Sequence, residues 1–247
     1  MHTSDLPDGS IALVTGASAG IGEQTARALN DAGYRVICAA RRESRLQALV
    51  AELGKRTIAL SLDVSDDASV DALYSRLPEA WHAIDILVNN AGHDVGGRRR
   101  FHEGDADEWL RIIDTNVSGM IRVTRKVIEG MLARDRGHIV NLGSIAGIVP
   151  YAGGTIYAGS KHAVHGFSQS LRLDYAKTGI RVSEIMPGMV RTEFAATRFR
   201  SAEKGAAFYD EFGVCLTPQD IARSVVFALG QPLHVEIAQL VVMPSGR

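Results

Sequence analysis

Tyr157 and Lys161 stand four residues apart in a stretch whose apolar pattern predicts a helix. Residues at this spacing share one helix face, so the phenol and the ammonium group would lie side by side. A tyrosine pKa is ordinarily near about 10, and a neighbouring positive charge lowers it by favouring the phenolate. The pair could therefore act as a general acid/base on a substrate oxygen. The same spacing also arises by chance, so its meaning depends on the rest of the chain.

A glycine-rich turn joins a predicted strand, Ile11–Thr15, to a predicted helix over residues 20–32. Glycine permits a tight turn and a close approach of the backbone to a phosphate, and the N-terminus of a helix attracts anions. The turn thus predicts a dinucleotide site, although a purely structural turn is the alternative. Its candidate cofactor contacts are Gly16, Ser18, Ala19, Gly20, Ile21 and Gly22.

The second predicted strand, Arg35–Ala40, is followed by Arg41 and Arg42. An enzyme that prefers NAD carries an acidic residue at this point, where it binds the ribose 2′-hydroxyl. Here two guanidinium groups could pair with a 2′-phosphate instead. The sequence therefore predicts NADP(H) as the cofactor, with solvated surface charge as the alternative for either arginine.

Short apolar runs alternate with longer amphipathic stretches along all 247 residues, which suits a single α/β domain. Continuous apolar strands are buried on both faces, as in a parallel sheet covered by helices on each side. The predicted strands are residues 11–15, 35–40, 57–62, 86–89, 138–142, 181–186 and 240–242. The predicted helices are residues 20–32, 43–53, 67–77, 107–134, 157–178 and 218–229.

Two segments lack a clear pattern: residues 93–104, which contain Arg98, Arg99 and Arg100, and residues 192–213. Long connections in compact domains are often binding loops or lids, so we expect a substrate lid at about residues 189–213. His93, one of Arg98 to Arg100, or one of Arg191, Arg198 and Arg200 could contact the substrate. The alternative for each is a structural or solvated side chain.

Composition excludes several other classes of function. Lys plus Arg number 27 and Asp plus Glu 28, which does not suggest a nucleic-acid partner. Residues 1–10 do not resemble a secretion signal, and no apolar run approaches the ~20 residues of a membrane span. Cys38 and Cys215 show no metal or disulfide spacing, so we expect reduced thiols, no metal and a cytoplasmic location.

Several motifs occur in order at predicted element ends: residues 15–22, Asp63-Val64, Asn89 to Gly92, Asn116, Ser144, Tyr157 with Lys161, and Pro187-Gly188. In this combination the chain resembles the short-chain dehydrogenase/reductase family over essentially its whole length. The resemblance implies a Rossmann-like, doubly wound sheet of about seven parallel strands in the order 3-2-1-4-5-6-7. It also implies a dinucleotide-binding and catalytic domain over residues 1–247.

The resemblance further implies a role for each catalytic residue. Ser144 would hydrogen-bond the substrate oxygen, and Tyr157 would give or take its proton. Lys161 would bind the nicotinamide ribose and lower the Tyr157 pKa. Asn116 would fix a helix distortion and hold a water that relays protons.

The remaining implied residues contact the cofactor. Asp63 and Val64 would flank the adenine, and Asn90, with Ala91 and Gly92, would lie near its ribose. At the nicotinamide end the implied contacts are Pro187, Gly188, Val190 and Thr192.

Residues 77–85, 150–154, 192–194, 198–199 and 242–244 resemble a subgroup that acts on serine and other 3-hydroxy acids with NADP, usually as homotetramers. Residues 93–100 depart from that subgroup, in which the stretch is mostly apolar and small. The substrate could thus be another acid, a polyol or sugar, a sulfonated aldehyde or an unrelated carbonyl compound. A sensor that binds NADPH without turnover is the alternative to an enzyme.

Overall fold

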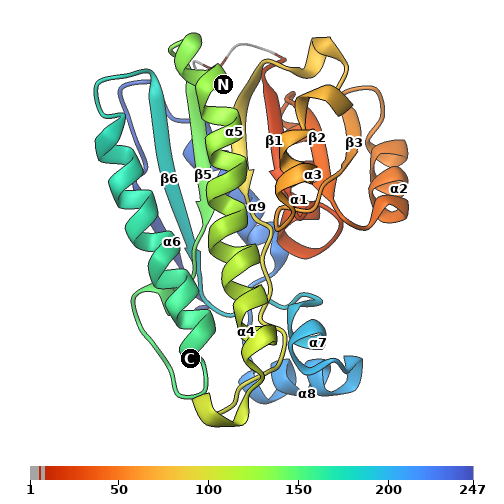
Figure 1. Cartoon of the computed structure of the whole chain (residues 1–247), viewed down its shortest axis with the longest axis vertical. Helices are drawn as coiled ribbons and strands as arrows, with labels where there is room; N and C mark the ends of the chain where they lie inside the picture. The colour runs from red at the N-terminus through yellow and green to blue at the C-terminus, as the bar shows by residue number, and fades with distance from the viewer. Residues whose placement is uncertain (1–5, 7–8, 247) are drawn as a thin grey trace.

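The computed structural model describes residue 6 and residues 9–246. Most of residues 1–10, the segment that does not resemble a secretion signal, lie outside the described residues. In the described part of the chain, seven parallel strands form one sheet in the order β3-β2-β1-β4-β5-β6-β7, which confirms the predicted topology (Figure 1). The strands are β1 Ile11–Thr15, β2 Arg35–Ala40, β3 Thr57–Ser61, β4 Ile84–Asn89, β5 Gly137–Leu142, β6 Ile180–Pro187 and β7 Gln239–Val242.

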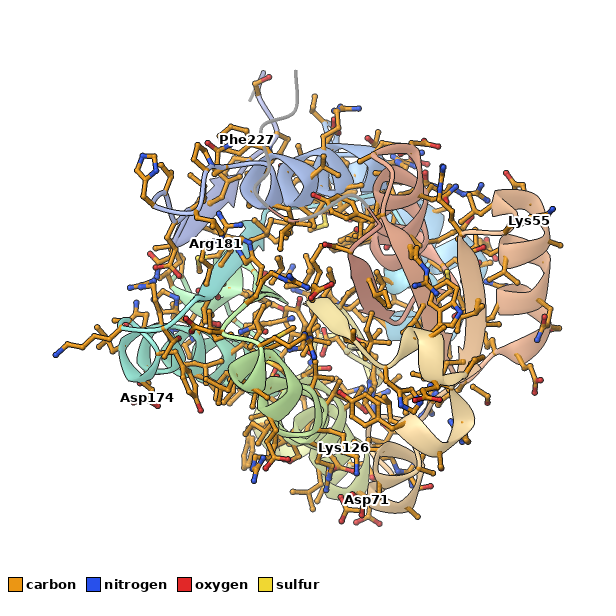
Figure 2. All side chains as sticks on the ribbon, turned by 90° about the horizontal axis from the view of Figure 1, so that it is seen from above. Lys55, Asp71, Lys126, Asp174, Arg181 and Phe227 are labelled. Carbon is orange, nitrogen blue, oxygen red and sulfur yellow. The ribbon has the colours of Figure 1, made fainter. Side chains whose placement is uncertain are left out.

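Helices cover both faces of the sheet. Helices α1, α2 and α9 pack on one face, and α3, α5 and α6 pack on the other. Figure 2 shows the two layers from above, with Phe227 of α9 at one side of the sheet and Lys126 of α5 with Asp71 of α3 at the opposite side. The helices are α1 Gly20–Asp31, α2 Glu43–Leu53, α3 Asp67–Asp71, α4 Ala106–Ile113, α5 Gly119–Ala133, α6 Thr155–Asp174, α7 Phe194–Phe199, α8 Ala202–Phe212 and α9 Pro218–Leu229.

The apolar strands explain why the fold needs both helix layers. Every residue of β1 is buried, and successive side chains enter opposite cores. Ala12 and Val14 join the core beneath α1 and α9, whereas Ile11 and Leu13 join the core beneath α5. A strand of this composition would expose apolar surface if either helix layer were missing.

Two predicted helices differ in the structure. The helix predicted over residues 67–77 ends at Asp71, and a 3₁₀ turn follows over Tyr74–Arg76. Leu77 has extended backbone angles because a residue before proline, here Pro78, is disfavoured in the helical region. The stretch predicted as one helix over residues 107–134 is interrupted by a π-helical turn, Asp114–Ser118, between α4 and α5.

All of the polar motifs lie at one edge of the sheet, because parallel strands end there together. β1 and β4 are neighbours in the sheet although β2 and β3 lie between them in sequence, so connections diverge on either side of this pair. Such a switch point opens a crevice at the carboxyl ends of the strands, where ligands bind in doubly wound folds. Among the described helices, none combines the length and the apolar character needed to cross a membrane.

Candidate active site

A cavity of about 660 Å³ lies over the carboxyl ends of the strands. It is walled by the glycine turn, the ends of β2 to β6, the first turn of α6, and α7 and α8. The structure therefore brings together predicted residues that are far apart in sequence. Those that line the cavity are Gly16, Ser18, Ala19, Gly20, Ile21, Arg41, Arg42, Asp63, Val64, Asn90, Ala91, Gly92, Ser144, Tyr157, Lys161, Pro187, Gly188, Val190 and Thr192.

Gly22 and Asn116 do not line the cavity but lie directly behind its wall. A Cβ on Gly22 would lie 2.4 Å from both the Gly16 carbonyl oxygen and the Asn90 Nδ2, so this glycine lets the turn pack on the end of β4.

The sequence pattern assigns no role to the Thr15 side chain. Its hydroxyl accepts hydrogen bonds from the backbone N–H groups of Asn90 (3.0 Å) and Ala91 (3.1 Å), which ties β1 to β4.

The glycine turn fits a bound pyrophosphate. Gly16 and Gly20 have φ angles of +68° and +57°, which side chains rarely adopt. The turn leads directly into α1, whose N-terminal N–H groups and dipole favour an anion.

Arginine side chains gather where the second strand ends. The Nε of Arg42 donates to the Ser18 hydroxyl at 2.9 Å, which fixes this guanidinium beside the glycine turn. Glu193, just before α7, accepts from Arg42 at 3.0 Å and from Arg45 at 2.8 Å. Although partial burial opposes it, these hydrogen bonds hold the pKa of Glu193 below its ordinary value. Two guanidinium groups thus hold one carboxylate, so this corner of the protein suits an anion.

Arg45 does not line the cavity, but it binds the Glu193 carboxylate together with Arg42, and sequence reasoning missed it although a signal was available. The available signal was that Arg45 lies in the first turn of the helix predicted over residues 43–53, close behind Arg41 and Arg42. Arg41 is more loosely held: its side chain is 67% exposed and its Nη1 lies 3.9 Å from an Asp63 oxygen.

Asn116 lies inside the π-helical turn and is 3% exposed. Its Oδ1 accepts from the backbone N–H of His93 at 2.9 Å, and its Nδ2 donates to the His93 carbonyl at 3.0 Å. Nδ2 also donates to the Ser160 hydroxyl at 3.1 Å, and that hydroxyl donates to the Tyr157 carbonyl at 2.7 Å. The side chain therefore connects the loop after β4 to the helix that carries Tyr157.

Tyr157 and Lys161 lie on the cavity side of the first turns of α6, as the spacing predicts. The Lys161 Nζ is 5.8 Å from the centre of the Tyr157 ring and donates to the Leu142 carbonyl at 2.7 Å. Ser144 follows the end of β5, and its Oγ accepts from the Ala146 N–H at 3.1 Å. The resulting arrangement places a phenol, an ammonium group and a hydroxyl around one end of the cavity.

Burial is the largest influence on the pKa of both Tyr157 and Lys161. It raises the pKa of Tyr157, and hydrogen bonding by Ser144 opposes the rise. Burial also lowers the pKa of Lys161 to about 8, while the charge of Glu184 opposes that fall. Lowering of the Tyr157 pKa by Lys161 stays a prediction.

His93 lines the cavity, yet both of its ring nitrogens have protein partners. Nδ1 accepts from the Val95 N–H at 3.4 Å, so Nε2 carries the proton and faces the Thr115 hydroxyl at 3.2 Å. Burial, with the charge of Arg41, lowers the pKa of His93, so the imidazole is neutral at neutral pH. These contacts favour a structural role for it.

Of the three arginines near the expected lid, only Arg198 lines the cavity. Arg191 pairs with Asp210 and Arg200 pairs with Glu108, both with largely exposed guanidinium groups. Phe194 of α7 packs edge-on against the Tyr157 ring at 5.6 Å, so this segment covers the phenol. No cluster of metal-binding side chains occurs within the part of the chain that the structure describes.

The sheet order, the glycine turn and the cavity at the switch point define a dinucleotide-binding α/β protein. A family model described as short chain dehydrogenase matches residues 10–203. The chain therefore belongs to the short-chain dehydrogenase family and is an oxidoreductase, which confirms the resemblance read from the motifs.

Individual relatives support the same placement. The chain is 44% identical over 235 residues to the NADP-dependent 3-hydroxy acid dehydrogenase YdfG of Salmonella typhi, covering 95% of this chain and 94% of that protein. It is 36% identical over 232 residues to the serine 3-dehydrogenase of Agrobacterium fabrum, covering 94% and 92%. The closed form of a serine dehydrogenase complexed with NADP+ superposes with a TM-score of 0.92 at 42% identity, covering 96% of this chain and 98% of that one.

Proposed function

We propose that this protein is an NADP(H)-dependent oxidoreductase that moves hydride between the nicotinamide and a small alcohol or carbonyl compound. The observation that best supports this function is that one cavity is lined by Tyr157, Lys161 and Ser144 together with the glycine turn and Arg42. The guanidinium groups that already hold the Glu193 carboxylate would hold the 2′-phosphate. The relatives named above as NADP-dependent or bound to NADP+ support this cofactor.

The protein's own residues supply the proton chemistry, while a bound nicotinamide supplies or accepts the hydride. Ser144 hydrogen-bonds the substrate oxygen. Tyr157 donates its proton to that oxygen during reduction, and its raised pKa keeps the phenol protonated at neutral pH. Lys161 would bind the nicotinamide ribose and would favour the phenolate during oxidation.

Asn116 is the fourth member of the proposed catalytic set. Its fixed hydrogen bonds to His93 and Ser160 hold the π-helical turn open behind the cavity. We propose that this turn retains a water molecule through which Lys161 exchanges protons with solvent.

Other cofactor contacts follow from position along the cavity. Asp63 and Val64 lie beyond the end of β3 and would flank the adenine, with Asn90 at its ribose. Pro187 ends β6, and Gly188, Val190 and Thr192 follow it. These four residues would hold the nicotinamide end. Residues 189–213 would act as the lid, since α7 and α8 wall the cavity and Phe194 covers Tyr157.

The proposed substrate is a 3-hydroxy acid or the corresponding 3-oxo acid. Relatives that cover almost the whole chain carry the names 3-hydroxy acid dehydrogenase and serine 3-dehydrogenase. A panel of 3-hydroxy acids, serine, polyols and simple secondary alcohols with NADP+ would test this class. Turnover of polyols but not of acids would replace it with a sugar or polyol dehydrogenase.

We also propose a homotetramer in the cytoplasm. Two sets of exposed apolar side chains lie on opposite layers of the fold and could each cover a second copy. One set is Leu110, Ile121 and Leu173 on α4, α5 and α6, and the other is Phe227, Leu233, Val241 and Met243 on and after α9. Light scattering coupled to size-exclusion chromatography would measure the assembly.

Replacement of Tyr157 tests the chemistry itself. We expect Tyr157→Phe to lower kcat by at least ~10²-fold, the usual scale of general acid/base catalysis. NADPH affinity, followed by nucleotide fluorescence, should change little because the phenol hydroxyl serves the substrate. Near wild-type turnover in this variant would refute the proposed role, and tight NADPH binding with no turnover of any substrate would indicate a sensor.

A further inference from the structure

Two arginines from different segments contact Tyr151 in the wall of the cavity. Arg98 belongs to the loop after β4, and Arg198 belongs to α7. Both line the same cavity as Tyr157. The Arg198 Cζ lies 5.8 Å from the centre of the Tyr157 ring and 5.3 Å from that of Phe194. A cation is thus held next to the proposed proton donor.

Arg198 is only 7% exposed, so its charge needs a partner inside the protein. Asp94, itself 5% exposed, supplies it: the Oδ2 of Asp94 lies 2.7 Å from the Arg198 Nε. Asp94 does not line the cavity, so the carboxylate holds Arg198 from behind. This ion pair engages Nε and leaves the two terminal nitrogens of the guanidinium for other acceptors.

These terminal nitrogens have little else to bind. Within the described residues, Nη2 donates a hydrogen bond to the Tyr151 hydroxyl at 3.5 Å, which is long for such a bond. The Arg98 Cζ lies 4.5 Å from the centre of the Tyr151 ring. Arg98, Arg198 and Asp94 together carry two positive charges and one negative charge, so this corner has an excess of one positive charge.

We propose that Arg198, flanked by Arg98, is a subsite for a singly charged anionic group of the substrate, either a carboxylate or a sulfonate, and that Asp94 is its positioning residue. This inference rests on the proposed function and assigns its substrate recognition to particular residues. The guanidinium fork matches two oxygens of such a group, and its place beside Tyr157 restricts the substrate to short acids. The loop segment 93–100, where the sequence departs from the subgroup it resembles, contributes both Asp94 and Arg98.

Matched pairs of substrates separate this role from that of a lid contact. We would measure NADP+-dependent oxidation of 3-hydroxypropionate, of its neutral methyl ester and of 2-hydroxyethane-1-sulfonate, in which the sulfonate takes the place of the carboxylate. We expect Arg198→Met to lower kcat/KM for the acid by ~10- to 100-fold, the scale of a lost charge-assisted hydrogen bond, and to change the ester much less. Activity with the sulfonate as well as the carboxylate would show that charge decides, and activity with the carboxylate alone would restrict the ligand to carboxylates.

Arg98→Met keeps the test open if the Arg198 variant does not fold. We expect ~3- to 10-fold higher KM for the acid in Arg98→Met, because a more exposed charge contributes less. Arg99→Met is the matched control, since Arg99 lies next in sequence but does not line the cavity, and its kinetics should equal those of the wild type. Equal losses with acid and ester in both arginine variants would overturn the subsite.

A binding readout distinguishes failure of the subsite from failure of the proposed function. The enzyme–NADPH complex can be titrated with 3-hydroxypropionate, which cannot react with the reduced cofactor, while nucleotide fluorescence is followed. We expect saturable binding that Arg198→Lys weakens by ~10-fold, because the ammonium lacks the planar fork. Turnover of neutral alcohols without any binding of the acid would overturn the subsite and leave the oxidoreductase intact. Absence of turnover with every substrate would overturn the proposed function instead.

Discussion

Glu193→Gln should strengthen NADPH binding, because the Glu193 carboxylate competes with the 2′-phosphate for Arg42 and Arg45. The carboxylate lies 3.0 Å from Arg42 and 2.8 Å from Arg45. The Glu193 side chain is 52% exposed, and those of Arg42 and Arg45 are 47% and 48% exposed, so solvent screens both pairs. At about 0.2–1 kcal/mol for each exposed pair, removing both corresponds to ~2- to 25-fold tighter binding. Because all three side chains are about half exposed, we expect the lower part of this range.

Titration of nucleotide fluorescence with NADPH and with NADH would measure the effect. NADH lacks the 2′-phosphate, so its Kd should not change in Glu193→Gln. The difference between the two nucleotides should shrink as salt is raised, since exposed charges are screened. Glu203→Gln is a suitable control because it removes the same charge from the exposed start of α8.

Two results would refute this reasoning. An unchanged or weaker affinity for NADPH would show that the carboxylate does not compete with the phosphate. An equal change for NADPH and NADH would show that Glu193 acts on the position of the lid.

The remaining predictions concern the cofactor phosphate, the buried lysine and the glycine turn. Arg42→Ala should weaken NADPH by ~10- to 100-fold with little effect on NADH, and Arg41→Asp should shift the kcat/KM ratio toward NAD; an unchanged ratio in both variants would contradict the assignment. Burial lowers the pKa of Lys161 to about 8. Below pH 8 the folded protein therefore carries a buried ammonium charge that destabilises it. Lys161→Met should therefore stabilise the protein by about 1–3 kcal/mol at pH 7. That gain should fall as pH rises from about 8 towards the ordinary lysine pKa of 10.5, because the unfolded state then retains protons that the folded state has lost. Urea unfolding at several pH values would show it, and a constant difference would count against it. Gly22→Ala should destabilise the fold by about 1–3 kcal/mol through contact with Gly16 and Asn90, as measured by urea unfolding. Gly166→Ala on α6, where a Cβ meets nothing within 4 Å, should be neutral or stabilising in the same measurement.

Local patterns predicted the sheet because each strand carries its own signal. The runs Ile11–Thr15 and Arg35–Ala40 are apolar enough to be buried on both faces, and the structure gives them those bounds. The helix predicted over residues 67–77 was wrong in its second half, since Pro78 restricts the residue before it and the chain tightens into a 3₁₀ turn.

The break between α4 and α5 was not visible from periodicity. A π-helical turn adds one residue to a single turn, so it shifts the apolar repeat by only one position between the two helices. Its position at Asn116 was implied only by resemblance. The hydrogen bonds to His93 and Ser160 show what the distortion accomplishes: it brings a side-chain amide against the loop after β4.

The sequence by itself determined the sheet, the glycine turn, the Tyr157–Lys161 pair and the arginines after β2, because each depends on residues close together in the chain. Tertiary structure alone decided which charges meet across long sequence separations. Neither the pairing of Glu193 with Arg42 and Arg45 nor that of Asp94 with Arg198 leaves a periodic signal in the chain. Ion pairs of this kind depend on how α7 docks over the carboxyl edge of the sheet, which is a property of packing between distant segments.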